Sequence, residues 1–480
     1  MKLNPKYYSA FKGFLVWGMC LFVLAYLISN RHRNTGTFNW MTPLWADQTG
    51  YYVYLPGLFI YDFNPHLFPE GIEEKTGQGF SLDLENNKVV TRYPSGVAVL
   101  QAPFFLIVHY LTAIIDQPRD GFSGIYHKVP SLAALFYTIL GFFFLWKFLR
   151  YYYMPHIALA TLLILFFGTN IYYYAVDSTG MSHIYSFSLF ATIAWVTKKM
   201  LVAEKENQLA NFTVWSFLFA LIVLVRPTNI FIFPFLFTLG LQSLQELWDR
   251  IKRFATFRNI LVISGAFFLV FLPQFLYWKY VSGSYIFYSY GEYGFSNLAS
   301  PKILELWFSP NNGMFLYSPL YLLIVTSIIE KLFHRTNRLN DWVIFGTFLV
   351  LTYVFASWFI FSFGCGYGSR NFVEYNVMFA IPLGYLLNRF ELWSLAKRLF
   401  FATLIIFLVY FNLKLIYSYD RCFQGGVWDF QKYASYLVKL SKYKQELELN
   451  EAEKKILPSI EYSKTLYLPL DKVNYMEFRS

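Results

Sequence analysis

The fold class is decided near the beginning of the chain by the uncharged stretch Phe14-Leu15-Val16-Trp17-Gly18-Met19-Cys20-Leu21-Phe22-Val23-Leu24-Ala25-Tyr26-Leu27-Ile28. With its flanks, over residues 11–29, it approaches the roughly 20 residues that a helix needs to cross a membrane. It lacks a small-residue cleavage site, so we expect a retained span and no cleaved signal peptide.

The composition of the whole chain agrees with this first stretch. Of its 480 residues, 56% are hydrophobic and only 14% are charged, whereas soluble domains carry about 25% charged residues. We therefore expect an all-α polytopic membrane protein. The net charge of +11 fits Lys and Arg gathered in cytoplasmic loops, so it predicts no nucleic-acid partner. The three cysteines exclude a disulfide framework and a CxxC metal signature.

Apolar runs long enough to span recur along the chain. They cover residues 11–29, 97–115, 128–149, 156–175, 184–200, 212–225, 229–245, 260–278, 313–329, 342–361, 372–388 and 398–417.

The distribution of basic residues favours about eleven transmembrane helices. Twelve alternating spans would put several Lys and Arg clusters on the outer side, against the positive-inside rule. If 97–115 is instead an outer juxtamembrane helix, 18 basic residues fall in compact inner loops, 11 in outer loops and 11 from Lys414 onward. Pro94 and Pro103 suit such a broken helix. The alternative, in which 97–115 is a true span, stays open.

This topology divides the chain into two parts. Residues 1–417 form a transmembrane domain whose first outer loop, 30–125, contains the juxtamembrane helix. Residues 418–480 form a short extracytoplasmic tail, in which 428–456 has helical spacing. The N-terminus is predicted inside and the C-terminus outside.

The first outer loop opens with Trp45-Ala46-Asp47-Gln48-Thr49-Gly50-Tyr51-Tyr52. Desolvation by aromatic neighbours raises the pKa of a carboxyl group and makes it a better general base. Asp47 is therefore a candidate catalytic base. The alternative is that Asp47 caps a short helix.

A second outer turn, Asp177-Ser178-Thr179-Gly180-Met181-Ser182-His183, holds another acid and a histidine. Asp177 is a candidate to orient an acceptor or hold a divalent metal, and His183 is a candidate to contact a phosphate or ligate a metal. The alternative is a polar turn in which Asp177 is a helix cap.

Three arginines lie near the predicted outer ends of apolar runs. Arg226 precedes Pro227, Arg370 follows the glycine-rich run 364–369, and Arg92 precedes Tyr93. Guanidinium groups suit bidentate phosphate binding, and an Arg at membrane depth usually has a function. The alternative is that Arg226 and Arg370 snorkel to lipid headgroups.

Several aromatic residues and two cysteines complete the set of candidates. Tyr51, Tyr52 and Tyr54 are placed to stack on a sugar ring, and Tyr51, Tyr52, Tyr93 and His183 are the candidate substrate contacts. Cys365 and Cys422 both fall outside in this topology, so a disulfide between them is an open alternative.

The order of these motifs resembles the GT-C superfamily of polyprenyl-phosphate-sugar-dependent glycosyltransferases, in particular its protein O-mannosyltransferase and lipid A aminoarabinose transferase branch. The likeness consists of Asp47 after span one, Tyr93-Pro94-Ser95-Gly96 opening a juxtamembrane helix, Asp177 in the second outer turn, and Arg226-Pro227. It covers roughly residues 1–390. Gln48 follows Asp47 where many members have a second acid, and the tail is shorter than in the aminoarabinose branch.

The resemblance implies a GT-C fold and an inverting sugar transfer from a polyprenyl-phosphate donor to a glycan, lipid or protein acceptor. Asp47 would then be the base with help from Asp177, and Arg92, Arg226 and Arg370 would hold the donor phosphate. No metal ligand is predicted, although a divalent metal stays an alternative. We expect a bacterial inner membrane protein whose site faces away from the cytoplasm. The rival hypothesis is a non-catalytic flippase or transporter of lipid-linked saccharide, which predicts polar residues near mid-span and matching halves.

Overall fold

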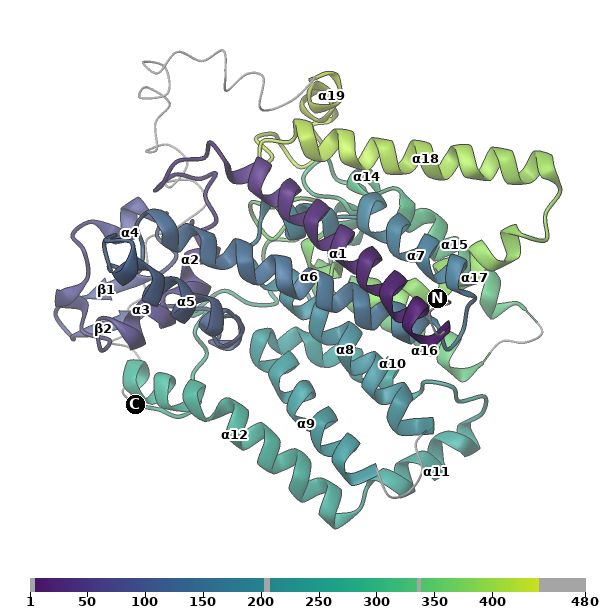
Figure 1. Ribbon diagram of the computed structural model, residues 1–480, viewed down its shortest axis with the longest axis horizontal. Coiled ribbons are helices and arrows are strands. Elements are labelled where there is room, and N and C mark those ends of the chain that lie inside the picture. Colours follow the sequence, from purple (N-terminus) through teal and green to yellow (C-terminus); the bar gives the residue numbers. More distant parts are fainter. Residues whose placement is uncertain (1–4, 203–207, 335–337, 440–480) are drawn as a thin grey trace.

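A computed structural model describes residues 5–202, 208–334 and 338–439. Within them the chain is helical apart from one two-stranded hairpin (Figure 1). The elements, in chain order, are α1 (Pro5–His32), α2 (Asp47–Tyr52), α3 (Tyr54–Phe59), η1 (Pro65–Leu67), α4 (Ile72–Lys75), β1 (Ser81–Asp83), β2 (Lys88–Val90), α5 (Gly96–Ile114), η2 (Gly124–His127), α6 (Lys128–Leu149), α7 (Pro155–Gly168), η3 (Tyr173–Asp177), α8 (Ser182–Val202), α9 (Gln208–Val225), η5 (Pro227–Ile232), α10 (Phe233–Phe237), α11 (Leu244–Phe254), α12 (Phe257–Ser282), α13 (Ile303–Phe308), α14 (Met314–Tyr317), α15 (Leu320–Leu332), α16 (Leu339–Ala356), η6 (Arg370–Phe372), α17 (Asn376–Phe390), α18 (Leu395–Ser418) and α19 (Phe430–Val438).

The helices confirm a multi-span membrane protein. In the described residues, seven segments are long and apolar enough to cross a membrane: Leu15–His32, Gly96–Ile114, Gly124–Leu149, Gln208–Val225, Phe257–Ser282, Leu339–Ala356 and Leu395–Ser418. The apolar helices Pro155–Gly168 and Pro227–Phe237 are shorter. The count of eleven spans stays a prediction. So does the juxtamembrane position of α5, because that helix is itself long enough to cross.

One predicted span is divided in the structure. The apolar run 229–245 ends as a helix at Phe237, and Gly240 has a left-handed backbone, with φ of 78°. A separate helix, α11, then begins at Leu244 after Ser243, whose side chain accepts a hydrogen bond from the Glu246 amide. A Ser cap followed three residues later by Glu is a helix-start signal. The predicted run therefore joins two different helices.

The membrane-spanning body is held together by close helix crossings. α6 packs on α8, and α9 packs on both α8 and α12. A Cβ at Gly141 would lie 2.9 Å from the Ser188 Cα, and a Cβ at Gly96 would lie 2.5 Å from the Val225 backbone nitrogen. Small residues at such crossings let helices approach closely where the surrounding lipid supplies no hydrophobic driving force.

Residues 30–125, the predicted first outer loop, form a lobe at the left of Figure 1. β1 and β2 pair antiparallel there, with Leu82 opposite Val89. The lobe has its own apolar core, which includes Tyr52, Phe80 and Tyr126 and reaches Tyr277 at the end of α12. Since the Tyr277 hydroxyl donates to the Val89 carbonyl at 3.1 Å, the lobe is tied to the helical body and α2 is held at its edge.

The described part of the C-terminal tail is a short helix beside the end of α18. α19 packs against α18, and Tyr433 of α19 donates to the Leu316 carbonyl at 2.7 Å. The helical spacing predicted for 428–456 corresponds to α19 as far as Val438. The rest of that segment, from residue 440, lies outside the described residues.

Candidate functional site

Asp47 lies at the first position of α2, and its side chain is bonded to two residues far away in sequence. Its Oδ1 accepts a hydrogen bond from the Tyr93 hydroxyl at 2.6 Å, and its Oδ2 lies 3.1 Å from Arg370 Nη2. The Asp47 and Arg370 side chains each keep 15% of their surface exposed. The residue before α2 is Ala46, and α2 has no side-chain cap within the described residues. The carboxylate is therefore directed at Arg370 and Tyr93 and does not cap its helix.

Glycines around α2 make room for this arrangement. A Cβ at Gly50 would lie 2.3 Å from both the Gly79 carbonyl oxygen and Cδ2 of the Tyr93 ring. Real Cβ atoms are not found at such distances, so only glycine lets Tyr93 lie against α2. Next to Asp47, the Gln48 side chain accepts a hydrogen bond from the Gly180 amide at 2.8 Å. Gln48, which stands where many GT-C members have a second acid, thus joins the first outer loop to the second outer turn.

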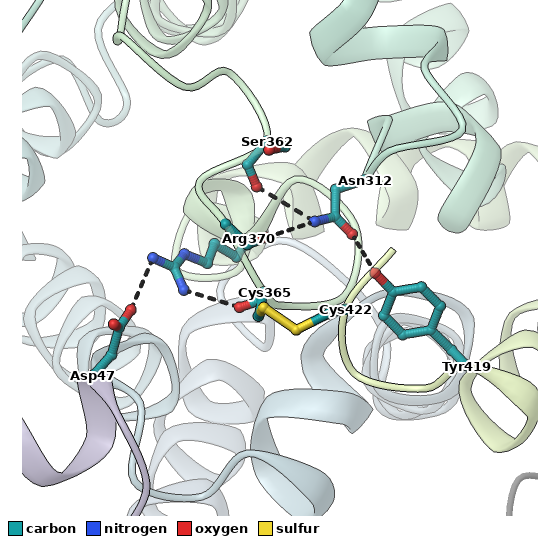
Figure 2. Close-up of a disulfide and its surroundings, with 8 residues drawn as sticks. Asp47, Asn312, Ser362, Cys365, Arg370, Tyr419 and Cys422 are labelled. Carbon is teal, nitrogen blue, oxygen red and sulfur yellow. Dashed lines mark hydrogen bonds and ion pairs between the residues drawn. A yellow bond between two sulfur atoms is a disulfide. The ribbon is translucent and has the colours of Figure 1, made fainter. Parts of the chain in front are cut away.

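Arg370 is held by the glycine-rich loop that precedes it, and Figure 2 shows this loop joined to the C-terminal segment by a Cys365–Cys422 disulfide. The Arg370 Nη1 donates to the Cys365 carbonyl at 3.3 Å. Burial alone would lower the pKa of Arg370, but the Asp47 carboxylate raises it. The arginine is therefore a fixed cation. The disulfide, which the sequence left open, is present in the structure.

Asn312 fixes the other side of the same loop. Its Nδ2 donates to the Ser362 carbonyl at 3.4 Å and to the Gly364 carbonyl at 3.0 Å. Its Oδ1 accepts a hydrogen bond from the Tyr419 hydroxyl at 3.2 Å (Figure 2). The loop that carries Arg370 is thus held by a buried amide and a disulfide, and both link it to the segment after α18.

Arg226 lies in a second ionic cluster, which reaches the segment after Arg370. Its Nη1 lies 3.2 Å from Glu374 Oε1 and 2.8 Å from His183 Nδ1. Its Nη2 donates to Asn371 Oδ1 at 2.5 Å. The side chains of His183 and Glu374 are both buried, and His183 Nδ1 lies 3.1 Å from Glu374 Oε2. Since Arg370 and Glu374 stand four residues apart, one short segment carries partners of both ionic clusters.

Two tyrosines lie between these clusters. Tyr51 packs on the Tyr93 ring at 4.5 Å between centroids. Burial raises the pKa of Tyr51, and the charges of Arg226, Asp47 and Arg370 act on the same hydroxyl. Burial also raises the pKa of Tyr290 in the loop after α12, on which Tyr51, Arg226 and Asp47 also act. The two ionic clusters and both phenols therefore share one electrostatic environment.

Arg92, the third predicted phosphate ligand, borders this environment. Its guanidinium carbon lies 6.0 Å from the centroid of the Tyr293 ring, and its carbonyl accepts a hydrogen bond from the Ser289 hydroxyl at 2.6 Å. Burial opposes the charged form of Arg92, yet Tyr93 and Asp47 raise its pKa. The loop after α12 thus contacts both the side chain and the backbone of Arg92.

Two other predicted residues lie in different surroundings. Asp177 is buried, and its Oδ1 lies 2.6 Å from Arg31 Nε at the end of α1. Tyr52 is fully buried in the outer lobe, where its hydroxyl donates to the Gly121 carbonyl at 2.7 Å. Its ring packs edge-on against Phe105. The structure gives Asp177 an arginine partner of its own and leaves Tyr52 no exposed surface for a sugar.

Sequence reasoning missed Glu374, Asn371 and Tyr290. Glu374 was hidden inside the apolar run 372–388, although an isolated acid at a membrane end is itself a functional signal. Asn371 had a weaker signal, namely its position directly after Arg370. Tyr290 is one of 39 tyrosines, and no local pattern separates it from the others.

The donor atoms around Asp47 do not suit a divalent metal. Its described neighbours are a guanidinium and a phenol, whereas Mg²⁺ and Ca²⁺ prefer several oxygen ligands. In the described parts of the chain, no group of three or more His, Cys, Asp or Glu side chains is placed to hold a metal ion.

The helices and their arrangement define a helical integral membrane protein, and its fold is similar to that of a solved glycosyltransferase. The particular likeness is to archaeal oligosaccharyltransferase AglB from Archaeoglobus fulgidus in complex with an inhibitory peptide and a dolichol-phosphate. The TM-score is 0.50 at 13% identity, and the match covers 97% of this chain and 61% of that one. A second structure, the Archaeoglobus fulgidus oligosaccharyltransferase tethered with an acceptor peptide that contains the NVT sequon, gives a TM-score of 0.49 at 14% identity over 92% of this chain and 57% of that one.

The chain therefore spans about three fifths of the length of these proteins. No model of a known protein family matches the chain. No curated protein matches it in sequence. The likeness confirms one part of the predicted fold, namely a helical membrane protein that is similar in structure to a glycosyltransferase.

Proposed function

We propose that this protein transfers a sugar from a polyprenyl-phosphate-linked donor to an acceptor hydroxyl, with inversion at the anomeric carbon. The observation that carries the proposal is the 3.1 Å contact between Asp47 and Arg370. The fold is similar to that of an oligosaccharyltransferase whose structure is in complex with a dolichol-phosphate, which supports the proposal. Transfer from such a donor needs a base for the acceptor and a cation for the lipid phosphate, and this pair supplies both.

In the proposed reaction, the donor phosphate binds Arg370, with Arg226 and Arg92 as further ligands. Arg370 then shares its charge with the phosphate, which loosens its bond to Asp47. The Asp47 carboxylate takes the proton of the acceptor hydroxyl as the acceptor oxygen forms a bond to the anomeric carbon. The bond from that carbon to the phosphate oxygen breaks, and its electron pair leaves with polyprenyl phosphate.

The arginines stabilise the charge that develops on the leaving group. A sugar-linked phosphodiester carries one negative charge, and the released polyprenyl phosphate carries up to two. Fixed cations aimed at a developing charge are among the largest contributions to catalysis. Tyr93 holds the Asp47 carboxylate in position, and Tyr51 is the tyrosine best placed to contact the sugar. We give Asp177 the role of anchoring η3 to α1 through Arg31, and leave Tyr52 out of the substrate site.

The proposed site faces away from the cytoplasm, in agreement with the disulfide. Cys365 and Cys422 lie in the loop that carries Arg370 and in the segment after α18. Disulfides persist in oxidising compartments. We therefore place these segments on the outer side of a bacterial inner membrane. The acceptor is proposed to be a glycan, lipid or protein that carries a free hydroxyl.

The test uses the purified full chain in sealed liposomes with polyprenyl-phosphate-linked sugars. Mass spectrometry would follow the release of polyprenyl phosphate and the mass gain of hydroxyl-bearing acceptors. We expect release that depends on the presence of an acceptor. Movement of intact donor across a bilayer without any release would support the transporter hypothesis and contradict this one.

A further inference from the structure

A cavity far from the proposed site lies beneath the amphipathic helix α11. Its volume is about 210 Å³, and it is lined by the end of α8, the beginning of α9, α10, α11 and the beginning of α12. α8 begins beside His183 in the site, whereas Thr197, fourteen residues later, lines the cavity. At 1.5 Å per residue the two lie about 21 Å apart along the helix. The cavity is therefore independent of the sugar-transfer site.

The lining is apolar, and its polar side chains already have partners. Trp215 donates to the Thr197 hydroxyl at 2.9 Å, and Asn259 donates to the Phe254 carbonyl at 3.1 Å. The other side chains are mostly aromatic and aliphatic, among them Phe212, Phe233 and Ile263. Apolar cavities of this size stay dry and take apolar ligands. The ligand portion that fits the cavity is therefore a hydrocarbon.

Arg250 places a cation in this otherwise apolar lining. It is half-buried, and its Nη1 donates to the carbonyls of Phe237 and Leu239, both at 2.8 Å. Burial and the neighbouring Arg253 lower the pKa of Arg250. An anion beside this guanidinium would favour its charged form.

The surrounding helix ends carry an excess of positive charge. The last turns of α8, together with α11 and the beginning of α12, hold six basic residues against two acidic ones, Glu246 and Asp249; the basic residues are Lys198, Lys199, Arg250, Lys252, Arg253 and Arg258. An anionic headgroup complements this charge, because basic residues near a membrane surface attract anionic lipids.

α11 has the pattern of a helix that lies in a membrane interface. Leu244 and Trp248, one turn apart, are 71% and 57% exposed, while Phe254 at the other end lines the cavity. An apolar stripe with Trp on one face and Lys or Arg on the other is typical of interfacial helices. In Figure 1, α11 lies at the lower right, where it connects α10 to α12. Lipid molecules would thus lie directly against the cavity.

We propose that this cavity binds one acyl chain of a phospholipid whose anionic headgroup lies against Arg250 and Arg253. The apolar lining receives the chain, and the two guanidinium groups select the headgroup charge. A zwitterionic lipid with the same chains would fit the cavity but gain less from the arginines. The site is a bilayer-lipid site distinct from that for the polyprenyl donor.

The test measures the melting temperature of the purified full chain in detergent with added phosphatidylglycerol or phosphatidylcholine of identical acyl chains. We expect phosphatidylglycerol to raise it by several degrees more than phosphatidylcholine does. This excess should be lost in an Arg250→Gln, Arg253→Gln double variant and kept in Lys397→Gln, an exposed basic residue at the beginning of α18. Comparing two lipids within each variant removes any effect of the substitution on basal stability.

A second variant tests the cavity itself. Ile263→Trp places a large ring in the lining and should abolish the excess. Leu261→Trp, two residues earlier and 56% exposed, is outside the lining and should keep it. If the double variant does not fold, Arg253→Gln alone replaces it, and we expect this variant to lose part of the excess. Equal shifts with both lipids in the wild type, or an excess that survives in all of these variants, would overturn the proposal.

Discussion

Arg370 Nη2 lies 3.1 Å from Asp47 Oδ2, although the two residues are 323 positions apart in the chain. Their side chains are equally exposed, each at 15%, so a small part of the ion pair faces solvent. Removing one partner of a partly buried ion pair is destabilising, because the remaining charge is left without a counter-charge. A phosphate that competes for the guanidinium would leave the carboxylate free to act as a base. In the proposed reaction, this contact links donor binding to base activation.

The first prediction concerns the phosphate site. Arg370→Ala should weaken binding of a polyprenyl phosphate analogue by about 1.5–3 kcal/mol, the scale of a hydrogen bond to a charged group. Arg226→Ala should act in the same direction. Titration of the purified protein with the analogue measures both, and Arg119→Ala in the outer lobe is the control. Unchanged affinity in both the Arg370 and Arg226 variants would rule out the phosphate site.

The second prediction concerns the disulfide that holds the Arg370 loop. Cys365→Ser should lower the free energy of unfolding by about 2–4 kcal/mol, because an open chain has more unfolded conformations. Donor affinity should also fall, since the Cys365 carbonyl accepts a hydrogen bond from Arg370. Cys20→Ser is the matched control, because Cys20 is an exposed free cysteine.

A reducing agent provides an independent check of the disulfide. It should weaken donor binding in the wild type and in Cys20→Ser, but have no further effect on Cys365→Ser. Full donor affinity in the reduced wild type would show that the disulfide does not position Arg370.

The third prediction concerns Gly50. An added Cβ would lie 2.3 Å from the Tyr93 ring, so Gly50→Ala should displace the Tyr93 hydroxyl from Asp47. Turnover should fall by about 10-fold, as a shift of about 1 Å near a reacting group can cost up to 100-fold. Donor affinity should change less. Gly346→Ala in α16, where a Cβ would meet nothing within 4 Å, should leave turnover intact. Equal turnover in the two variants would contradict the role of Tyr93.

The sequence predicted which residues are polar at membrane depth better than how they pair. Asp47, Arg226 and Arg370 stood out because charge is rare beside apolar runs, and the structure brings them into neighbouring clusters. Their ionic partners come from segments more than a hundred residues away, so no local pattern reveals them. The ion pair of Glu374 with Arg226 and the ion pair of Asp177 with Arg31 are not visible in the sequence for the same reason.

The apolar runs likewise predicted where helices lie better than where each helix begins and ends. The run 229–245 reads as one span because Gly240 interrupts it without adding any charge. Composition does not decide whether 97–115 crosses, since α5 carries no charged residue and is apolar enough to span.

The fourth prediction therefore concerns topology. Reporter fusions at Arg253 and Arg389 should lie in the cytoplasm, and a fusion after Gly425 should lie outside. The physical reason is that short loops rich in Lys and Arg are retained on the cytoplasmic side. Paired fusions before Gly96 and after Ile115 test α5: the same side at both would show a juxtamembrane helix, and opposite sides a span. A cytoplasmic C-terminus would exclude eleven spans.

The fifth prediction concerns Asp47 as the catalytic base. Asp47→Asn preserves the size of the side chain, and its amide oxygen can still accept the Tyr93 hydrogen bond. It cannot take up a proton at neutral pH. We expect turnover to fall by about 100-fold or more, the range for loss of a general base. Donor affinity should be kept or increased, because Arg370 no longer has a carboxylate to compete with the phosphate.

Asp177→Asn separates catalysis from structure in the same assay. Its carboxylate pairs with Arg31, and both side chains are buried. The substitution leaves Arg31 without its counter-charge and should lower the melting temperature, while the remaining folded protein keeps most of its turnover per molecule. Asp47→Asn should show the reverse, with slow turnover in a protein of nearly normal stability. Near-normal turnover in Asp47→Asn would refute the assignment, and activity lost only in Asp177→Asn would move the base to Asp177.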